Sequence, residues 1–264
     1  MKGIEKLIKT VKKLRSPNGC PWDKQQTHKT LKRYLIEETY EAIDAIEKND
    51  LSLLKEELGD VLLQIILHAQ IASEKKKFTF NDICEEINKK MVTRHPHVFS
   101  NTKVKNVKEV MVNWEKIKAS ENNKRNNNLF ENIPKSLPAL IYASKTSKKA
   151  AKKGIEWKKE DDIWRTLSSE ILEFKVAHKK KRKKEQIDEM GDILFTVVNI
   201  ARWNQIDPED ALKLSTKKFM NRFNKVNTEL KKANITLIPG NKNINQTLDK
   251  FWKKAKINER EKKK

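Results

Sequence analysis

Apolar side chains recur at steps of three and four residues through most of the chain, which is the periodicity of α-helices with one buried face. The stretch 35–46 shows this pattern, and the stretch 58–72 is apolar on nearly all sides, as in a helix at the centre of a bundle. Six glycines and seven prolines in 264 residues leave little material for β-hairpins. The pattern therefore predicts an all-α protein.

The second half of the chain repeats the order of the first. The periodic stretch 163–177 is the counterpart of 35–46, the stretch 190–203 matches 58–72, and Gly154-Ile-Glu-Trp157 echoes Gly19-Cys-Pro-Trp22. The polar run Ser120 to Asn128 between the halves has the composition of a linker. We therefore predict a tandem repeat of two helical-bundle domains, at 1–119 and 133–264, joined by a linker at 120–132. Further helices are predicted at 78–91 (with a cap signal at Asn81-Asp82), 108–119, 137–151, 208–233 and 245–256.

Both halves contain the pattern Glu-x-x-Glu, fifteen further residues, then Glu-x-Gly-Asp, with the second copy 132 residues after the first. Residues three apart on a helix share a face, and an antiparallel hairpin returns its second helix to the level of the first after legs of roughly 10 Å. Each copy should therefore gather four carboxylates on one surface. We call them the first carboxylate set (Glu38, Glu41, Glu57 and Asp60) and the second carboxylate set (Glu170, Glu173, Glu189 and Asp192).

Four carboxylates that meet without a cation repel one another, by about 4 kcal/mol for two unit charges at 4 Å and an effective dielectric constant of 20. A divalent cation removes this repulsion, and hard oxygen ligands without a nearby cysteine favour Mg²⁺, or Mn²⁺, over Zn²⁺. The glycine within each copy, Gly59 or Gly191, costs about 1 kcal/mol inside a helix. We interpret it as permitting the close approach of a neighbouring helix or a ligand.

The alternative is that these residues are ordinary exposed acids, and the identical spacing of two copies argues against it. Di-iron bundle proteins need Glu-x-x-His pairs, which the two sets lack. His68 follows Asp60 by eight residues and is interpreted as a packed or partly exposed histidine. His95 and His97 are assigned to a structural loop rather than to a metal site.

Pairs of cationic and aromatic residues follow each carboxylate set in the same order and could hold phosphate groups and a base. Trp252 lies beside Phe251, so a core position remains an equal alternative for it. The candidate substrate-binding residues are Lys218, Arg222, Trp252 and Lys256, and their first-half parallels are Lys90, Arg94, Trp114 and Lys118.

The formal net charge of +22 is typical of nucleic-acid-binding proteins. The excess lysine is, however, spread along the whole chain with many Asn and Ile residues, as AT-rich codons would produce, and nucleic acid is not the expected partner. Two cysteines in separate segments, Cys20 and Cys84, indicate free thiols in a reducing compartment. The first fifteen residues lack the apolar core of a signal peptide and the apolar runs are too short to span a bilayer. A soluble cytoplasmic protein without a membrane partner is predicted.

Taken together, these motifs resemble the MazG-type nucleoside triphosphate pyrophosphohydrolases. The resemblance covers nearly the whole chain. Its residues are Gly19-Cys-Pro-Trp-Asp-Lys24, Glu37-Glu38-Thr-Tyr-Glu41, Glu57-Leu-Gly-Asp60, Arg94-His-Pro-His-Val-Phe99, Ile133-Pro134 with Leu137-Pro138, and the second carboxylate set.

The resemblance implies a homodimer that hydrolyses nucleoside triphosphates between the α and β phosphates with Mg²⁺, giving a nucleoside monophosphate and pyrophosphate in nucleotide-pool house-cleaning. It also implies that the domain at 133–264 is the main catalytic one. Glu170, Glu173, Glu189 and Asp192 would then be its metal-binding and catalytic residues.

The second copy departs from the family pattern, because Ser169 stands where the first copy has Glu37 of its doubled glutamate. Loss of that neighbouring carboxylate could reduce activity in the second domain. The alternative function is a basic nucleic-acid-binding or regulatory protein without turnover, and intact carboxylates in both copies argue against it.

Overall fold

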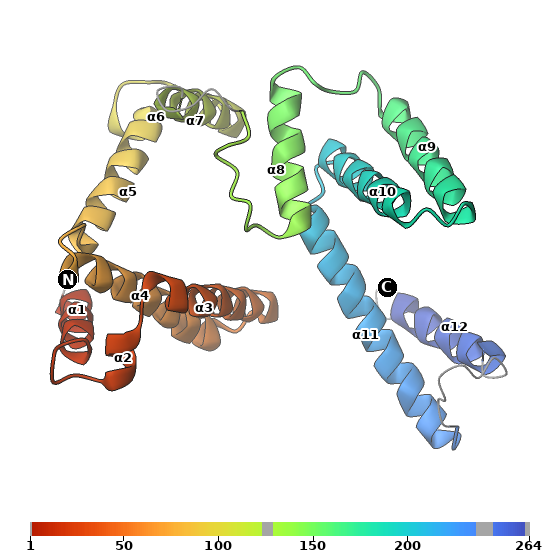
Figure 1. Cartoon of the computed structure of the whole chain (residues 1–264), viewed down its shortest axis with the longest axis horizontal. Helices are drawn as coiled ribbons and strands as arrows, with labels where there is room; N and C mark the ends of the chain where they lie inside the picture. The colour runs from red at the N-terminus through yellow and green to blue at the C-terminus, as the bar shows by residue number, and fades with distance from the viewer. Residues whose placement is uncertain (1, 123–128, 236–244, 262–264) are drawn as a thin grey trace. The chain divides into compact units, whose positions relative to one another are not determined.

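The computed structural model describes residues 2–122, 129–235 and 245–261, and every regular element in these ranges is a helix (Figure 1). The predicted all-α class and the tandem repeat are therefore confirmed. The chain divides into two compact units, at 1–125 and 126–264. The predicted linker at 120–132 overlaps the end of the last helix of the first unit, and its residues 123–128 lie outside the described ranges.

The first unit contains α1 (Lys2–Leu14), α2 (Pro21–Gln25), α3 (His28–Lys48), α4 (Leu51–Glu74), α5 (Phe80–Arg94), α6 (Pro96–Phe99) and α7 (Val107–Asn122). α3 and α4 form a long antiparallel hairpin, α1 and α5 pack on α4, and α7 packs on α5 (Figure 1). Buried Val11, Leu31 and Ile66 join α1, α3 and α4 in one apolar core. The hairpin that carries the first carboxylate set is therefore the centre of this unit.

The second unit contains α8 (Ala139–Lys152), α9 (Glu160–Lys179), α10 (Lys183–Trp203), α11 (Pro208–Lys232) and α12 (Asn245–Glu261). α9 and α10 form a hairpin like that of α3 and α4, α8 packs on α10 and α11, and α12 packs on α11. A separate apolar core of Val226, Leu230 and Ala255 joins α11 to α12. In this unit the second carboxylate set therefore lies on the α9–α10 pair, and the candidate substrate-binding residues lie on the α11–α12 pair.

Tight turns close both hairpins between the two halves of each carboxylate set. α3 ends at Lys48, Asn49 takes a left-handed conformation with φ of 54°, and the Asp50 side chain caps α4 by accepting bonds from the backbone N–H groups of Ser52 and Leu53. In the second hairpin the left-handed residue is Lys181, with φ of 56°. These turns set the register that returns the second helix of each hairpin to the carboxylates of the first.

The helix after the first hairpin begins differently from the prediction. We expected Asn81-Asp82 to cap it, but the N-cap of α5 is Thr79, whose hydroxyl accepts a bond from the backbone of Asp82. The Asp82 carboxylate reaches back to the backbone N–H of Thr79 at 2.7 Å. Asp82 is therefore the third helical residue of a capping box, and the helix is capped two residues earlier than Asn81.

Candidate metal and phosphate site

The α3–α4 hairpin brings the first carboxylate set together. One oxygen each of Glu38 and Glu41 on α3 and of Glu57 on α4 lie within 4.8 Å of one another. Asp60, one turn after Glu57, is close enough to raise the pKa of Glu38. The interpretation of four carboxylates on one surface therefore matches the positions of these side chains.

The α9–α10 hairpin repeats the arrangement. Oxygens of Glu170, Glu173 and Glu189 lie within 4.8 Å of one another, and Asp192 raises the pKa of both Glu170 and Glu189. Both clusters combine partly buried and exposed groups from two helices. Each presents hard oxygen atoms at a separation that one or more divalent cations could bridge.

In both clusters the pKa values of carboxyl groups are shifted as expected for anions that no cation neutralises. Partial burial is the largest cause that raises the pKa of Glu38, and the carboxylates of Asp60, Glu41 and Glu57 add to it. The pKa of Glu57 is raised by desolvation first and then by Glu41 and Asp60. A bound divalent cation would reverse these shifts, so the donor set fits a metal such as Mg²⁺. Its identity is a prediction that the geometry alone does not test.

Gly59 and Gly191 do not have the helix-packing role that we expected. A Cβ atom added at either position would meet no atom of the described chain within 4 Å. No neighbouring helix of the described residues approaches either glycine, so that interpretation is wrong here. The close approach of a ligand remains a prediction.

Glu37 and Ser169 make the surroundings of the two clusters different. Glu37 is among the anions that raise the pKa of Glu38. Ser169 instead donates a hydrogen bond from its hydroxyl to Oε1 of Glu173 at 2.9 Å. Where the first unit has an anion that repels Glu38, the second unit therefore has a serine that hydrogen-bonds to the candidate metal ligand Glu173.

In the first unit the cationic and aromatic pairs come together where α5 meets α7. The Arg94 guanidinium lies 5.4 Å from the centre of the Trp114 ring and pairs with Glu121 at 2.6 Å. The Lys118 ammonium lies 4.7 Å from the centre of the same ring. Lys90 lies one turn before Arg94 and pairs with Glu86 at 3.0 Å. Arg94 and Lys118 thus lie against the ring of Trp114, and the role of these residues in substrate binding remains a prediction.

In the second unit the corresponding residues lie on α11 and α12. Trp252 packs against the core of that helical pair, and its ring centre lies 5.3 Å from that of Phe219. It is half-buried, so it has both a core contact and an accessible surface. Lys218 and Lys256 are exposed, and Arg222 is half-buried. Their role as substrate-binding residues remains a prediction.

The structure does not bring these four residues to the second carboxylate set. Over the described residues, each charged group that shifts the pKa of Glu170 or Glu189 is an acid of α9 or α10. A substrate that used both groups would have to connect two helical pairs of this unit, or contact a second copy of the chain.

Three features near the candidate sites were missed in the sequence. Arg15 donates two 2.8 Å bonds to Glu74 and also binds the backbone oxygens of Asp23 and Gln26, which fixes the loop around Trp22. His68 is partly exposed, as predicted, but its Nδ1 lies 2.8 Å from Nδ1 of His28. A cavity lined by Trp22 lies between α2 and α3. Arg15 and Trp22 flank the Gly-Cys-Pro motif, which was the available signal.

His95 and His97 do not lie in the loop that we expected: His95 joins α5 to α6, and His97 lies within α6. His95 Nδ1 lies 2.7 Å from the backbone oxygen of Met91, and the His95 and His97 rings lie 5.7 Å apart, centre to centre. Nδ1 of His97 is buried without a hydrogen-bond partner among the described residues. No group of three or more metal-ligating side chains in the described ranges includes either histidine.

Comparison with known proteins places the chain in a family. The model of the MazG nucleotide pyrophosphohydrolase domain matches residues 26–99 and again residues 158–227. The nucleoside triphosphate pyrophosphohydrolase/pyrophosphatase MazG of Thermotoga maritima is 41% identical over 255 residues, which are 96% of this chain and 95% of that protein. The nucleoside triphosphate pyrophosphohydrolase of Escherichia coli K12 is 41% identical over 86% of this chain and 88% of its own length.

Two further relatives differ from this chain in length. The uncharacterized protein YabN of Bacillus subtilis is 45% identical over 95% of this chain, but the match spans 51% of that protein. The crystal structure of a mazG-related protein from Thermotoga maritima is 30% identical, covers 44% of this chain and 98% of its own, and has a TM-score of 0.38. The two regions matched by the family model contain both complete carboxylate sets, and the chain belongs to the MazG nucleotide pyrophosphohydrolase family.

Proposed function

We propose that the chain is a magnesium-dependent nucleoside triphosphate pyrophosphohydrolase that cuts between the α and β phosphates and releases a nucleoside monophosphate and pyrophosphate. The observation that carries this proposal is the convergence of Glu170, Glu173 and Glu189 within 4.8 Å on the α9–α10 hairpin of a MazG-family chain. The names of the Thermotoga and Escherichia relatives support the same activity.

In this proposal the second carboxylate set holds Mg²⁺, with Mn²⁺ as an alternative. Held by these carboxylates, such a cation would polarise the phosphate oxygens and neutralise charge on the leaving pyrophosphate. Glu170 or Glu173 orients the attacking water or accepts its proton, since both are carboxylates at the cluster. Ser169 holds Glu173 through the 2.9 Å hydrogen bond and so limits the rotamers of that carboxylate.

Substrate binding is assigned to Lys218, Arg222, Trp252 and Lys256. Lys218 and Arg222 lie one turn apart on α11, and Trp252 and Lys256 lie one turn apart on α12, which packs on it. The cations would bind phosphate oxygens and the tryptophan ring would stack on the base. Support comes from the first unit, where Arg94 and Lys118 already lie against Trp114.

We propose further that the protein is a cytoplasmic homodimer that clears unwanted nucleotides. Large apolar side chains are exposed on the first hairpin, among them Ile36, Tyr40 and Ile43, whose exposed fractions are 49%, 51% and 37%. A surface of this kind is typical of a face that a partner covers. Cys20 and Cys84 are free thiols, which suits a reducing compartment. No helix among the described residues is long and apolar enough to cross a bilayer.

The deciding experiment is incubation of the full chain with each NTP and dNTP in the presence of Mg²⁺, with chromatography of the products. We expect pyrophosphate and the matching nucleoside monophosphate. A nucleoside diphosphate with inorganic phosphate, or no product, would contradict the proposal. Glu185→Gln is the matched control, because it removes one half-buried charge of α10 that pairs with Arg182 at 3.0 Å and is not part of the second carboxylate set.

A further inference from the structure

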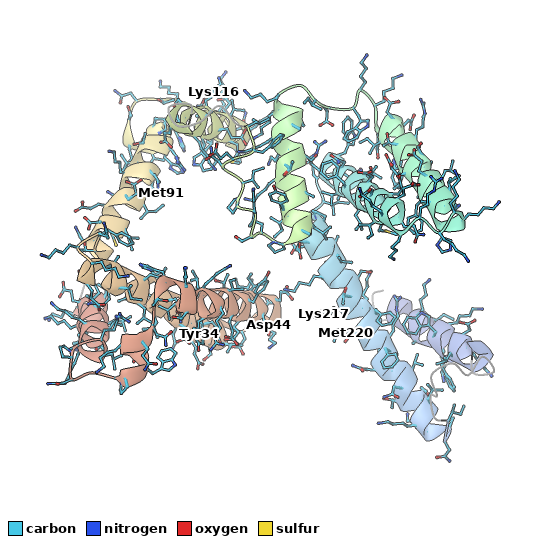
Figure 2. All side chains as sticks on the ribbon, viewed as in Figure 1. Tyr34, Asp44, Met91, Lys116, Lys217 and Met220 are labelled. Atoms are coloured by element: carbon cyan, nitrogen blue, oxygen red, sulfur yellow. The ribbon has the colours of Figure 1, made fainter. Side chains whose placement is uncertain are left out.

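Two histidines face each other at the open end of the α3–α4 hairpin. His28 is the first residue of α3, and His68 lies 40 positions later on α4. Their Nδ1 atoms are 2.8 Å apart, which is within hydrogen-bond distance. The pair lies at the end opposite the turn at Asn49, and Figure 2 labels Tyr34 nearer to this end of α3 and Asp44 nearer to the turn. The proposed function uses neither histidine.

The two imidazole rings lie edge to edge rather than face to face. Their planes differ by 3°, and parallel planes that contain atoms 2.8 Å apart cannot be separated by more than that distance. Stacked rings would need about 3.5 Å between their carbon atoms. The ring centres are nevertheless 5.1 Å apart, so the offset runs mainly along the ring planes. This is the geometry of an N–H···N hydrogen bond, in which the two Nδ1 atoms share one proton.

The burial of the second His68 nitrogen decides which ring donates this proton. Nε2 of His68 is buried and has no hydrogen-bond partner among the described residues, whereas His28 is exposed. A buried N–H group without an acceptor is costly, so we assign the proton of His68 to Nδ1, which donates to Nδ1 of His28. His28 then carries its own proton on Nε2. Both rings are neutral in this arrangement.

Neither ring can take a further proton without a loss. Protonation of His28 at Nδ1 would place a second hydrogen between the facing nitrogen atoms and break the bond. Protonation of His68 at Nε2 would put a positive charge at a buried atom without a partner. Desolvation, followed by the charge of His28, lowers the pKa of His68. The closed pair therefore excludes protons that the separated, solvated rings would bind.

The other charged groups around the pair titrate far from the range of histidine. α1 and α5 meet α4 through apolar side chains of the first core, among them Val11 and Phe80. Arg15, in the segment after α1, pairs with Glu74 of α4 and lowers its pKa. Over the described residues, the charge that shifts the pKa of His68 is that of His28. The charged side chains of α2 and of the first two turns of α3 are Asp23, Lys24, Lys29, Lys32 and Arg33.

The matching positions of the second unit hold no histidine. With the 132-residue offset of the two carboxylate sets, His28 and His68 correspond to Glu160 and Ile200. Glu160 accepts a 3.2 Å hydrogen bond from Asn204, and Ile200 does not titrate. The start of α9 therefore provides an internal reference for the start of α3.

We propose that the His28–His68 pair is a pH-sensitive switch, which holds the start of α3 on α4 when both rings are neutral and releases it when they are protonated. The capping box of Thr27 and Thr30 opens α3 directly beside the pair. Release therefore loosens the first turn of the helix. The turn at Asn49 lies at the other end of the hairpin and keeps the carboxylates in register. Neither state of the switch requires nucleotide hydrolysis.

The direction of the pH dependence follows from proton binding. A histidine whose pKa is lowered in the folded protein contributes stability that is present above the ordinary pKa of about 6.5. This stability is lost as the pH falls from there through the lowered value. The first carboxylate set acts in the opposite direction, because the raised pKa values of Glu38 and Glu57 favour the closed hairpin in acid. A variant without the histidine pair separates the two contributions.

Backbone hydrogen exchange of the full chain in EDTA, at pH 7 and at pH 5.5 and corrected for intrinsic rates, tests the switch. Leu31 and Ile163 are matched probes, since they correspond in the two units and both side chains are fully buried. We expect protection at residues 31–33 to fall by about tenfold if opening takes up one proton, and by more if both rings take one. Protection at residues 163–165 should change by less than about twofold, because no histidine pair lies there.

His28→Gln removes the titrating ring from an exposed position and leaves a polar side chain, so the fold should persist. The loss of protection between pH 7 and pH 5.5 should then shrink to that of residues 163–165. His68→Gln is the second variant and should have the same effect. His178→Gln is the matched control, since it removes an exposed histidine of α9 whose ring contact is with Phe174 of its own helix. It should leave the loss at residues 31–33 unchanged.

Three results would overturn the proposal. The first is an equal loss of protection at the starts of α3 and α9 in the parent protein. The second is a pH-dependent loss at residues 31–33 that persists in both His28→Gln and His68→Gln. The third is a loss of protection on addition of EDTA at pH 7, which would show that a metal ion rather than a shared proton joins the two rings.

Discussion

The two units share the geometry of their carboxylates and differ in what surrounds them. In the first unit the cluster has Glu37 as a further anion, and the cavity at the start of α3 is lined by Lys29, Lys32 and Arg33. In the second unit Ser169 binds Glu173, and the matching stretch of α9 has no such excess of cations among its described cavity-lining residues. The hairpin register that gathers the carboxylates is thus common to both units, whereas the residues around the carboxylates differ.

A similar contrast holds for the ion pair that fixes each hairpin to the segment before it. In the first unit the arginine, Arg15, precedes the hairpin and the acid, Glu74, ends α4. In the second unit the acid, Glu156, precedes the hairpin and the arginine, Arg202, lies in the last turn of α10, at 2.7 Å. The positions of the arginine and the glutamate are exchanged, yet in both units one ion pair joins the end of the hairpin to the segment before it. Either arrangement of the two charges therefore makes this connection.

The largest effect should come from removing one carboxylate from each unit. If the second unit is the main catalytic one, Glu189→Gln should lower kcat/KM by about 100- to 10,000-fold, since it removes a ligand of the proposed metal site. Glu57→Gln, the same change in the first unit, should leave most of the activity. Steady-state rates of pyrophosphate release decide between them, and a greater loss in Glu57→Gln would reverse the assignment of the catalytic unit.

The two ion-pair clamps should contribute comparably to stability despite their opposite polarity. Arg15→Ala and Arg202→Ala each remove a mostly buried guanidinium and leave its carboxylate partner unpaired, at a cost of about 2–4 kcal/mol. Arg202→Ala also breaks the 2.7 Å bond to the Ser147 hydroxyl in the α8–α10 contact. Chemical denaturation of both variants measures this, with Arg165→Ala as an exposed control.

The same pairs predict acid sensitivity. Arg15 holds the pKa of Glu74 below its usual value, and Arg202 does the same for Glu156. A depressed pKa in the folded state gives stability that is present above the ordinary glutamate pKa and is lost as the pH falls through the folded value. The arginine variants should therefore lose less stability than the parent protein between neutral pH and pH 4. An equal loss would show that these pairs contribute little.

The carboxylate clusters predict the opposite dependence on pH. The pKa values of Glu38, Glu57, Glu170 and Glu189 are raised by desolvation and by neighbouring anions. Without metal, both hairpins should become more stable as the pH falls from 7 towards these raised values, because protonation removes the repulsion. At pH 7, Mg²⁺ should do the same, with about 2.7 kcal/mol of stabilisation at 100 times its dissociation constant.

Thermal melting with and without Mg²⁺ separates the units. Glu38→Gln with Glu41→Gln should abolish the magnesium-dependent shift of the first unit and Glu170→Gln with Glu173→Gln that of the second. Each double variant should also melt higher than the parent in EDTA at pH 7, since two repelling charges are gone. A shift that survives in the double variant of its own unit would place the metal elsewhere.

The sequence predicted the hairpins because their information is local. The steps of three and four residues and the fifteen-residue gap between Glu41 and Glu57 determine which carboxylates meet, whatever the rest of the chain does. The same periodicity is present in α1, although α1 is not among the predicted helices. Its Ile4, Leu7, Ile8 and Val11 have the spacing of a buried helical face, and the many lysines between them hid the pattern.

The remaining features depend on contacts between distant segments. The pairing of Arg15 with Glu74 joins residues 59 positions apart, and that of His28 with His68 joins residues 40 positions apart. No periodic pattern encodes either contact. The cavity beside Trp22 was hidden for the same reason, because it depends on where the loop before α3 is anchored. The contact of Trp252 with Phe219 is compatible with both a core position and a binding position.

The smallest expected effect concerns the residue that most clearly distinguishes the two clusters. Ser169→Ala removes the hydroxyl bound to Glu173 and should lower kcat by about two- to tenfold with little change in KM, as for loss of one hydrogen bond of about 0.5–1.5 kcal/mol. Ser169→Glu restores the pattern of the first unit. Because a fifth carboxylate would raise the pKa of Glu170 as Glu37 does that of Glu38, the acidic limb of its pH–rate profile should move to higher pH. Ser168→Ala is the matched control, since that hydroxyl is bound to the backbone oxygen of Trp164. Unchanged kcat in Ser169→Ala, or a pH profile that Ser169→Glu does not move, would mean that the contrast between Glu37 and Ser169 has no bearing on catalysis.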